Sequence, residues 1–481
     1  MSPTQEDSTH NPAPELLLSE LSALMNAHRH AFGQERVFRR AWGLLLGWLF
    51  AFSRKTMTQL LVALGWVCDD WSANYRLLSE GRLDYDRLTQ TLFSETLRHV
   101  PEAEPYRTFV DATPILRHSK TMPGTFWGRA AGGLGFRPNV RRMQRFVNLA
   151  WLVPQENGYT RAIPLRWFSA LPQKAVPAKG EPTRREWEAG LLALQWVRQR
   201  LDEAGRAKQW LMATADGSYD VNDIWIQLPK RTLLVVRCAK NRRLYELPKP
   251  KEGRGRKPTY GTQAPHPQEW LHRKGGWERA TLEVRGKQRL VKYRVRGPYL
   301  VEGSGQQPVF LLVVKGHTIR NKAGRQVRYR PPSYSLVNAL KREGQWVMPA
   351  DAVELLTWAW QRWEGEVSHR ELKSGFGVGQ MQCWSQKGSL LAVQWAVWMY
   401  AVLVLSGYRA WSLCRGSLSP PPRWREPARR WSLNTLWQAY RQELWQPAEF
   451  QAVRCGSPSN WPEIPWLKQG LWNAARGSMR G

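Results

Sequence analysis

The stretch RTFVDAT, residues 107–113, marks the point at which the apolar pattern of the chain changes from helical to strand-like. A short apolar run rich in β-branched and aromatic residues is typical of a β-strand. Two further runs of this kind follow, MQRFVNLAWLV (143–153) and YTRAIPLRWF (159–168). Three such runs in succession predict that a sheet begins here.

Downstream of these strands, helical and strand-like patterns alternate. A helical pattern begins near Thr183 and is followed by two strand-like runs, KQWLMATADG (208–217) and RTLLVVRCAK (231–240). The short helical piece SYDVNDIWIQL (218–228) separates the two runs. Strands in a row followed by alternation with helices predict an α/β layer with a mixed sheet.

Upstream of RTFVDAT the chain reads as helical. We expect residues 1–25 to form a disordered tail, because the N-terminal stretch is polar and acidic. Residues 26–100 are expected to form an all-α N-terminal domain. Within it, TMTQLLVALG (56–65) and DDWSANYRLLSEG (69–81) are two short helices around a glycine turn. A DNA-binding helix-turn-helix and an ordinary helical hairpin both fit this pattern.

Residues 241–344 have a different composition and are expected to form a basic, β-rich insertion. Two runs within it are strand-like, ATLEVRGKQRLVKYRVRG (280–297) and PVFLLVVKGHTI (308–319). Between positions 230 and 330 there are 26 Lys and Arg but 6 Asp and Glu, so 26 − 6 = 20 of the excess charges lie here. A solvated surface would also be basic, but charge this one-sided repels itself and favours contact with phosphates.

The charge of the whole chain limits the classes of partner. The formal net charge is +32 over 481 residues, which indicates a polyanionic partner such as nucleic acid. The five cysteines are widely separated, which argues against a disulfide framework or zinc site and favours a reducing compartment. The apolar run at 390–408 is nearly long enough to span a membrane, but we interpret it as a buried helix. We therefore expect a cytoplasmic protein with no membrane partner.

The stretch QRWEGEVSHRELKSG, residues 361–375, carries three acids on one predicted helix that begins at Asp351 and stops at Gly375. At 100° per residue Glu366 shares a stripe with three cations, beside an apolar stripe that includes Trp363. The cations are Arg362, Arg370 and Lys373. Glu364 and Glu371 fall at the far edge of the apolar stripe. Glu366 is thus the acid set among cations, although salt bridges along the helix would give the same pattern.

Two aspartates complete a candidate site. Asp111 and Asp216 each lie at the end of an apolar strand-like run, where open α/β sheets build their sites. Each could instead cap a turn. Together with Glu366 they form a set of oxygen ligands that suits Mg²⁺ or Mn²⁺. Two such ions about 4 Å apart catalyse phosphodiester transfer.

The order of these acids resembles the bacterial insertion-sequence DDE transposases, over roughly residues 55–405. The resemblance rests on Asp in FVDAT, Asp in TADGSYD and Glu in RWEGEVSHRELK, with 150 positions between Asp216 and Glu366. One branch of that family carries a β-rich insertion in this gap and the helix signature Tyr-x2-Arg-x3-Glu-x6-Lys. Here Arg362, Glu366 and Lys373 match the signature, and Ala359 stands at the tyrosine position.

The resemblance implies an RNase H-like catalytic core, formed here by residues 101–240 and 345–411. By the resemblance, Asp111, Asp216 and Glu366 would bind two Mg²⁺ ions, for which Mn²⁺ would substitute, and Arg362 and Lys373 would hold DNA phosphates. Arg370, on the same stripe, is a further candidate for phosphate contact. The activity implied is cut-and-paste transposition of double-stranded DNA by a homodimer that pairs the two ends, at the nucleoid.

Two alternatives remain open on the sequence. One is a repurposed or inactive transposase that binds DNA without cutting it, and the other is a non-mobile RNase H-like nuclease. Residues 412–481 form a C-terminal region to which the sequence assigns no role.

Overall fold

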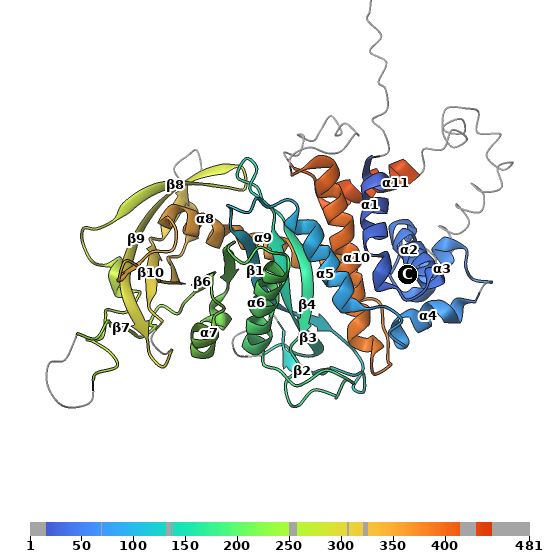
Figure 1. The fold of residues 1–481 in the computed structure, drawn as a ribbon, viewed down its shortest axis with the longest axis horizontal. Coiled ribbons are helices and arrows are strands. Elements are labelled where there is room, and N and C mark those ends of the chain that lie inside the picture. Colours follow the sequence, from blue (N-terminus) through green and yellow to red (C-terminus); the bar gives the residue numbers. More distant parts are fainter. Residues whose placement is uncertain are drawn as a thin grey trace, which may run out of the picture.

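A computed structural model of the chain describes residues 16–68, 70–130, 136, 138–249, 257–304, 307–320, 326–413 and 430–444. Figure 1 shows a central sheet flanked by helices, with a strand-rich part on one side of it and a group of helices on the other. One hydrophobic core joins the helical group to the sheet, and a second lies between the sheet, the strand-rich part and helix α8.

Helices form the N-terminal part, as the sequence predicts: α1 Leu16–Ala27, η1 Arg29–Ala31, α2 Glu35–Phe50, α3 Met57–Leu64, α4 Trp71–Ser79 and α5 Tyr85–Leu97. The two short helices around a glycine turn are α3 and α4. Gly65 ends α3 with a left-handed backbone (φ 74°), and Asp70 caps α4 through Ala73 N–H. The expected tail at 1–25 is wrong for its second part, because α1 begins at Leu16 and buries Leu17, Leu21 and Leu24. Residues 1–15 lie outside the described residues.

The central sheet begins with the three predicted strands. Its strands are β1 Tyr106–Leu116, β2 Phe126–Arg129, β3 Val140–Leu152, β4 Ala162–Ser169, β5 Leu211–Ala215 and β6 Thr232–Arg237. β1 and β3 are antiparallel, as are β3 and β4, whereas β5 and β6 run parallel to β1. This mixed sheet is consistent with the expected RNase H-like core.

Helices cover both faces of this sheet. Those that contact its strands include α6 Glu186–Glu203, α8 Ala352–Gln361, α9 Trp363–Arg370 and α10 Gly388–Trp411. The other helical elements of this part of the chain are η2 Gly217–Tyr219, α7 Asn222–Gln227, the π-helical turn η4 Glu371–Phe376 and α11 Leu433–Leu444. Side chains alternate between the faces of a strand, so Val110 joins the core that contains α6 while Phe109 joins the core that contains α8. Asp111 shares the face of Phe109.

The β-rich insertion is continuous with the central sheet. Its elements are β7 Leu244–Glu246, η3 Glu269–Leu271, β8 Glu278–Val284, β9 Lys287–Val301, β10 Val309–Val314, β11 His317–Arg320, β12 Gln326–Arg330, β13 Ser333–Asn338, β14 Leu340–Arg342 and β15 Gln345–Val347. β13 pairs antiparallel with β6, placing Ser335 opposite Arg237, and β10, β9 and β7 extend the sheet beyond it. This pairing covers the edge of β6 and fixes the insertion against the core.

The single helix expected from Asp351 to Gly375 is interrupted. Asp351 caps its start as predicted, through Val353 and Glu354 N–H. Helix α8 ends at Gln361 and α9 begins at Trp363, so the helix is interrupted at Arg362. There, Gly365 N–H donates to Arg362 O, three residues earlier, as in a 3₁₀ turn. Glu354 does not complete a capping box, because its carboxylate pairs with Arg107 of β1.

The interruption changes which side chains are buried. Trp363, expected in the apolar stripe, is 51% exposed, whereas Glu364, expected at the far edge of that stripe, is 2% exposed. The expectations for these two residues were wrong because the angular phase of an unbroken helix does not hold across Arg362.

The long apolar run is the buried helix α10, as predicted. Among the described residues it is the one helix long and apolar enough to cross a membrane, but its most apolar window is entirely buried within the fold. Figure 1 shows α10 between the sheet and the N-terminal helices. The described part of the C-terminal region, α11, returns to this group, and Glu443 accepts hydrogen bonds from Leu17 and Leu18 N–H.

Candidate active site

Strand pairing brings two of the candidate acids to the same edge of the sheet. β1 and β5 are parallel neighbours, with Val110 beside Ala215. Asp111 follows Val110 within β1, and Asp216 follows Ala215 where β5 ends. The two aspartates are therefore adjacent across neighbouring strands, as their positions in the sequence predict.

Helix α9 brings the third acid to this edge. Gly365 packs directly on Phe109, and a Cβ at Gly365 would lie only 2.3 Å from the Phe109 ring. The absence of a side chain lets α9 approach β1 closely and places the next residue, Glu366, beside Asp111. Arg362 connects the two acids: its Nη1 lies 3.6 Å from Asp111 Oδ2 and 3.9 Å from Glu366 Oε1.

The electrostatics confirm that the acids share one environment. The pKa of Asp111 is raised to about 7, chiefly by burial; Arg362 lowers it, and the nearby Asp216 and Glu366 contribute to the rise. Burial also lowers the pKa of Lys373, against the influence of Asp111 and Glu366. A positive charge close to a carboxyl group in such surroundings stabilises its ionised form and lowers its pKa.

Asp216 holds the turn that follows β5. Its Oδ1 accepts hydrogen bonds from Ser218 N–H (2.9 Å) and Ser218 Oγ–H (2.6 Å), and Ser218 Oγ also lies 2.8 Å from Glu186 of α6. Tyr219 is buried behind this turn. The turn-capping role that the sequence left open is thus present, and Oδ2 remains a second oxygen for another partner.

The other two acids of the stretch 361–375 have structural partners. Glu364 pairs with Arg430 at 2.8 Å and with Arg285 at 3.8 Å. Glu371 pairs with Arg161 at 2.8 Å and accepts the hydroxyl of Tyr400 at 2.7 Å. Glu366, with 47% of its side chain exposed, is the acid of this stretch that is accessible beside Asp111.

A buried polar pair supports the site, and no sequence pattern predicted it. Asn148 of β3 stands directly opposite Asp111 in the register, and its amide Nδ2 donates to His369 Nε2 of α9 at 3.0 Å. Burial, together with the charges of Lys373 and Arg362, lowers the pKa of His369 to about 3, so the ring is neutral and can accept this bond. The pair ties α9 to β3, one helical turn from Glu366.

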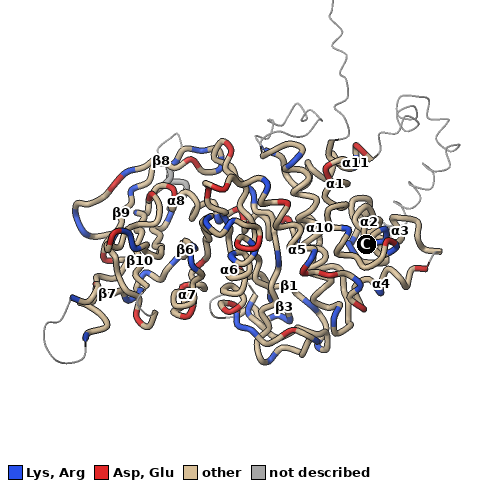
Figure 2. Tube along the Cα trace, in the orientation of Figure 1, with Lys and Arg blue, Asp and Glu red and all other residues tan. Residues whose placement is uncertain are grey.

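The predicted cations fall into two groups. Arg362 and Lys373 both interact with the acids. Arg370 is exposed at the end of α9, and no ion pair between it and the three acids is present among the described residues. Figure 2 shows further Lys and Arg positions along the strands of the insertion, on the same side of the core as α8.

The donor chemistry of this edge fits a hard divalent cation, because three carboxylates converge and one is buried at an energetic cost. Within the described ranges, no three His, Cys, Asp or Glu side chains already form a closed metal-binding group. Arg362 lies between two of the acids and supplies a positive charge there.

The two aspartates directly follow the paired residues Val110 and Ala215 of the adjacent parallel strands, in a strongly basic chain, and this arrangement is consistent with an enzyme that acts on polynucleotides. The family model of the DDE superfamily endonucleases matches residues 29–298, more than half of the chain, and the protein belongs to this family. The match includes Asp111 and Asp216 and ends before Glu366. No curated protein sequence matches the chain significantly.

Membership confirms the resemblance to DDE transposases at the level of the superfamily. It supports a transposase-like or nuclease-like activity on DNA, and endonucleases of this superfamily generally depend on divalent metal ions.

Proposed function

We propose that the protein is a DNA transposase of an insertion sequence, which cuts the ends of its element and joins them to target DNA. The proposal is supported mainly by the surroundings of Asp111 in a chain of the DDE endonuclease family: Arg362 contacts both Asp111 and Glu366, and Asp216 neighbours Asp111 across β1 and β5. We further place it in the Tyr-Arg-Glu-Lys branch, with Ala359 in the tyrosine position.

In this proposal, Asp111, Asp216 and Glu366 hold two Mg²⁺ ions, and Mn²⁺ substitutes for them. When bound, the ions stabilise the charge that develops on the attacking and leaving oxygens. Asp111 is ionised more readily once positive charge is near it. Arg362 and Lys373 hold non-bridging phosphate oxygens of the DNA, and Arg370 contacts the backbone further along.

The chemistry proceeds in two displacements. Water attacks the phosphorus at the element end; the bond to the 3′-oxygen breaks, and the released strand carries a 3′-hydroxyl. That hydroxyl then attacks a phosphodiester of the target DNA, and one phosphodiester replaces another. We also propose that a homodimer pairs the two ends and that the protein acts in the cytoplasm, at the nucleoid.

The decisive experiment compares the protein with Glu366→Gln on labelled duplex DNA that spans the end of its own element, with Mg²⁺ and with EDTA. We expect strand cuts that expose 3′-hydroxyls in Mg²⁺, none in EDTA, and at least about a 10³-fold slower cut by Glu366→Gln. Glu364→Gln is the control, because it removes a neighbouring acid that pairs with Arg430 and Arg285 and not with the candidate site. Its folding is measured separately, because Glu364 is buried.

Salt-sensitive binding without any metal-dependent cut would instead favour the repurposed DNA-binding protein. Cuts on any duplex, without preference for the element end, would favour a non-mobile nuclease.

A further inference from the structure

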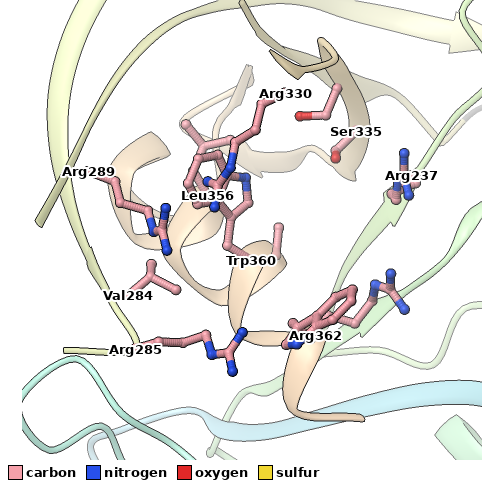
Figure 3. Close-up of a pocket in the computed structure, with 12 residues that line it drawn as sticks. Arg237, Val284, Arg285, Arg289, Arg330, Ser335, Leu356, Trp360 and Arg362 are labelled. Carbon is pink, nitrogen blue, oxygen red and sulfur yellow. The ribbon is translucent and has the colours of Figure 1, made fainter. Parts of the chain in front are cut away.

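A cavity of about 290 Å³ lies between the insertion and the catalytic core, and five arginines surround it. Three come from the insertion (Arg285, Arg289 and Arg330) and two from the core (Arg237 and Arg362). Figure 3 shows Arg285, Arg289 and Arg330 on the insertion side of Trp360, with Arg237 and Arg362 on the core side. We call this the arginine pocket.

No Asp or Glu is among the described residues that line the arginine pocket. Two of its arginines form ion pairs outside the lining: Arg285 reaches Glu364 at 3.8 Å, and Arg362 reaches Asp111 and Glu366. The positive field extends to His317, whose pKa is lowered by burial and by Arg330 and Arg289. Five guanidinium groups around one partly enclosed space produce a positive potential that attracts an anion.

The shape and chemistry of the pocket select a phosphate. Guanidinium groups bind phosphate oxygens through two parallel hydrogen bonds, and Ser335 adds a hydroxyl. The volume lies at the lower end of ligand pockets, which span roughly 300–1,000 Å³, and so suits one nucleotide unit. The Trp360 ring is stacked by Arg330, whose guanidinium carbon lies 5.2 Å from the ring centre. The indole therefore orients Arg330.

The pocket is joined to the acids through one residue. Arg362 lines it and also contacts Asp111 at 3.6 Å and Glu366 at 3.9 Å. We infer that the arginine pocket holds a backbone phosphate of the DNA strand being cut, close to the scissile phosphate, and thereby sets which bond reaches the acids. This inference rests on the proposed function and adds to it a phosphate site built largely by the insertion.

The test measures binding without catalysis, in EDTA. The probe is a fluorescein-labelled thymidine hexanucleotide, followed by fluorescence anisotropy, beside the same probe with a neutral methylphosphonate at the central one of its five linkages. We expect Arg289→Gln with Arg330→Gln to weaken binding of the charged probe by about tenfold per arginine and to make its salt dependence about one unit shallower per arginine. The neutral linkage should weaken binding to the native protein but hardly affect the variant.

Matched controls separate the pocket from general charge. Arg279→Gln with Lys287→Gln removes two exposed cations from the same β8–β9 hairpin outside the pocket, and we expect less than about a threefold loss. The variant Arg289→Lys with Arg330→Lys keeps the positive charges but loses the paired hydrogen bonds. Its affinity for the charged probe should lie between those of the native protein and the Gln variant. Thermal melting must show that each variant folds.

Two results would overturn the inference: equal losses in the pocket and control variants, or a neutral linkage that weakens both native and variant proteins alike. Because no cutting is needed, the outcome is separate from that of the Glu366→Gln experiment. The pocket variant could lose binding, and the neutral linkage could matter only in the native protein, while no protein cuts DNA. That result would support the phosphate site and contradict the transposase proposal.

Discussion

At the scale of single residues, neighbouring acids on one helix differ because of their partners. Glu366 projects to the edge of the sheet, while Glu371 is held between Arg161 and the Tyr400 hydroxyl. A buried ion pair adds little to the folding stability compared with an apolar pair of similar volume. Removing one partner, however, is strongly destabilising, because it leaves the other charge buried and uncompensated.

We therefore expect Glu371→Ala to lower the free energy of unfolding by about 3–5 kcal/mol, because the Arg161 side chain is only 6% exposed. Urea denaturation followed by circular dichroism measures this. Glu366→Ala, with its half-exposed side chain, should change the stability by no more than about 0.5 kcal/mol. Equal effects of the two substitutions would show that Glu371 is not held by a structural ion pair.

At the scale of elements, the distance between α9 and β1 decides whether the acids meet. Gly365 sets this distance, because its missing side chain leaves room for the Phe109 ring. The Asn148–His369 hydrogen bond then fixes α9 along β3. The helical pattern of the sequence carries no information on either contact.

Gly365→Ala should displace α9, since the new Cβ would lie 2.3 Å from the Phe109 ring. We expect the free energy of unfolding to fall by about 1–3 kcal/mol. The rate of DNA cleavage should fall by more than the loss of folded protein explains, because Glu366 moves with the helix. Cleavage rates and urea denaturation are measured together. Phe109→Leu in the same chain should restore part of the activity, while Gly33→Ala, in open space, should be neutral. No recovery in the double variant would point away from this contact.

At the scale of the whole molecule, the chain closes around α10. The N-terminal helix α1 packs on α10, and α11 returns from the C-terminal region to cap α1 through Glu443. At the end of α1, His28 is buried edge-on against Trp398 of α10, and its Nδ1 donates to Leu24 O at 2.7 Å. Burial lowers the pKa of His28 to about 4 from an ordinary 6.5.

This shift predicts that acid weakens the attachment of α1. Between pH 6.5 and 4 the unfolded chain binds a proton at His28 that the folded chain does not, so the free energy of unfolding falls as the pH falls, by up to about 3 kcal/mol. His28→Asn should lack this part of the pH dependence. Denaturation midpoints of both proteins at several pH values between 4 and 8 measure the difference. Parallel pH profiles would mean that His28 is not buried in the neutral form.

Much of this protein was determined by local sequence. The strands at 107–113, 143–153 and 159–168 and the helices around Gly65 follow from apolar periodicity and turn residues, which act over a few positions. The same patterns predict the strand end before Asp216, whereas β1 continues past Asp111 to Leu116; both candidates could still be found before the fold was known.

Tertiary structure alone decided the rest. Segments far apart in the chain meet at the buried Glu364, in the pairing of β13 with β6, at the return of α11 and around the arginine pocket. The interruption at Arg362 is local, but the helical periodicity of the sequence did not predict it. Periodicity predicts which face of an element is apolar, but not which distant element will cover it. The sequence already favoured Glu366 among the three acids, but the partners that hold Glu364 and Glu371, and the arginine pocket, depend on contacts that form only when the whole chain is folded.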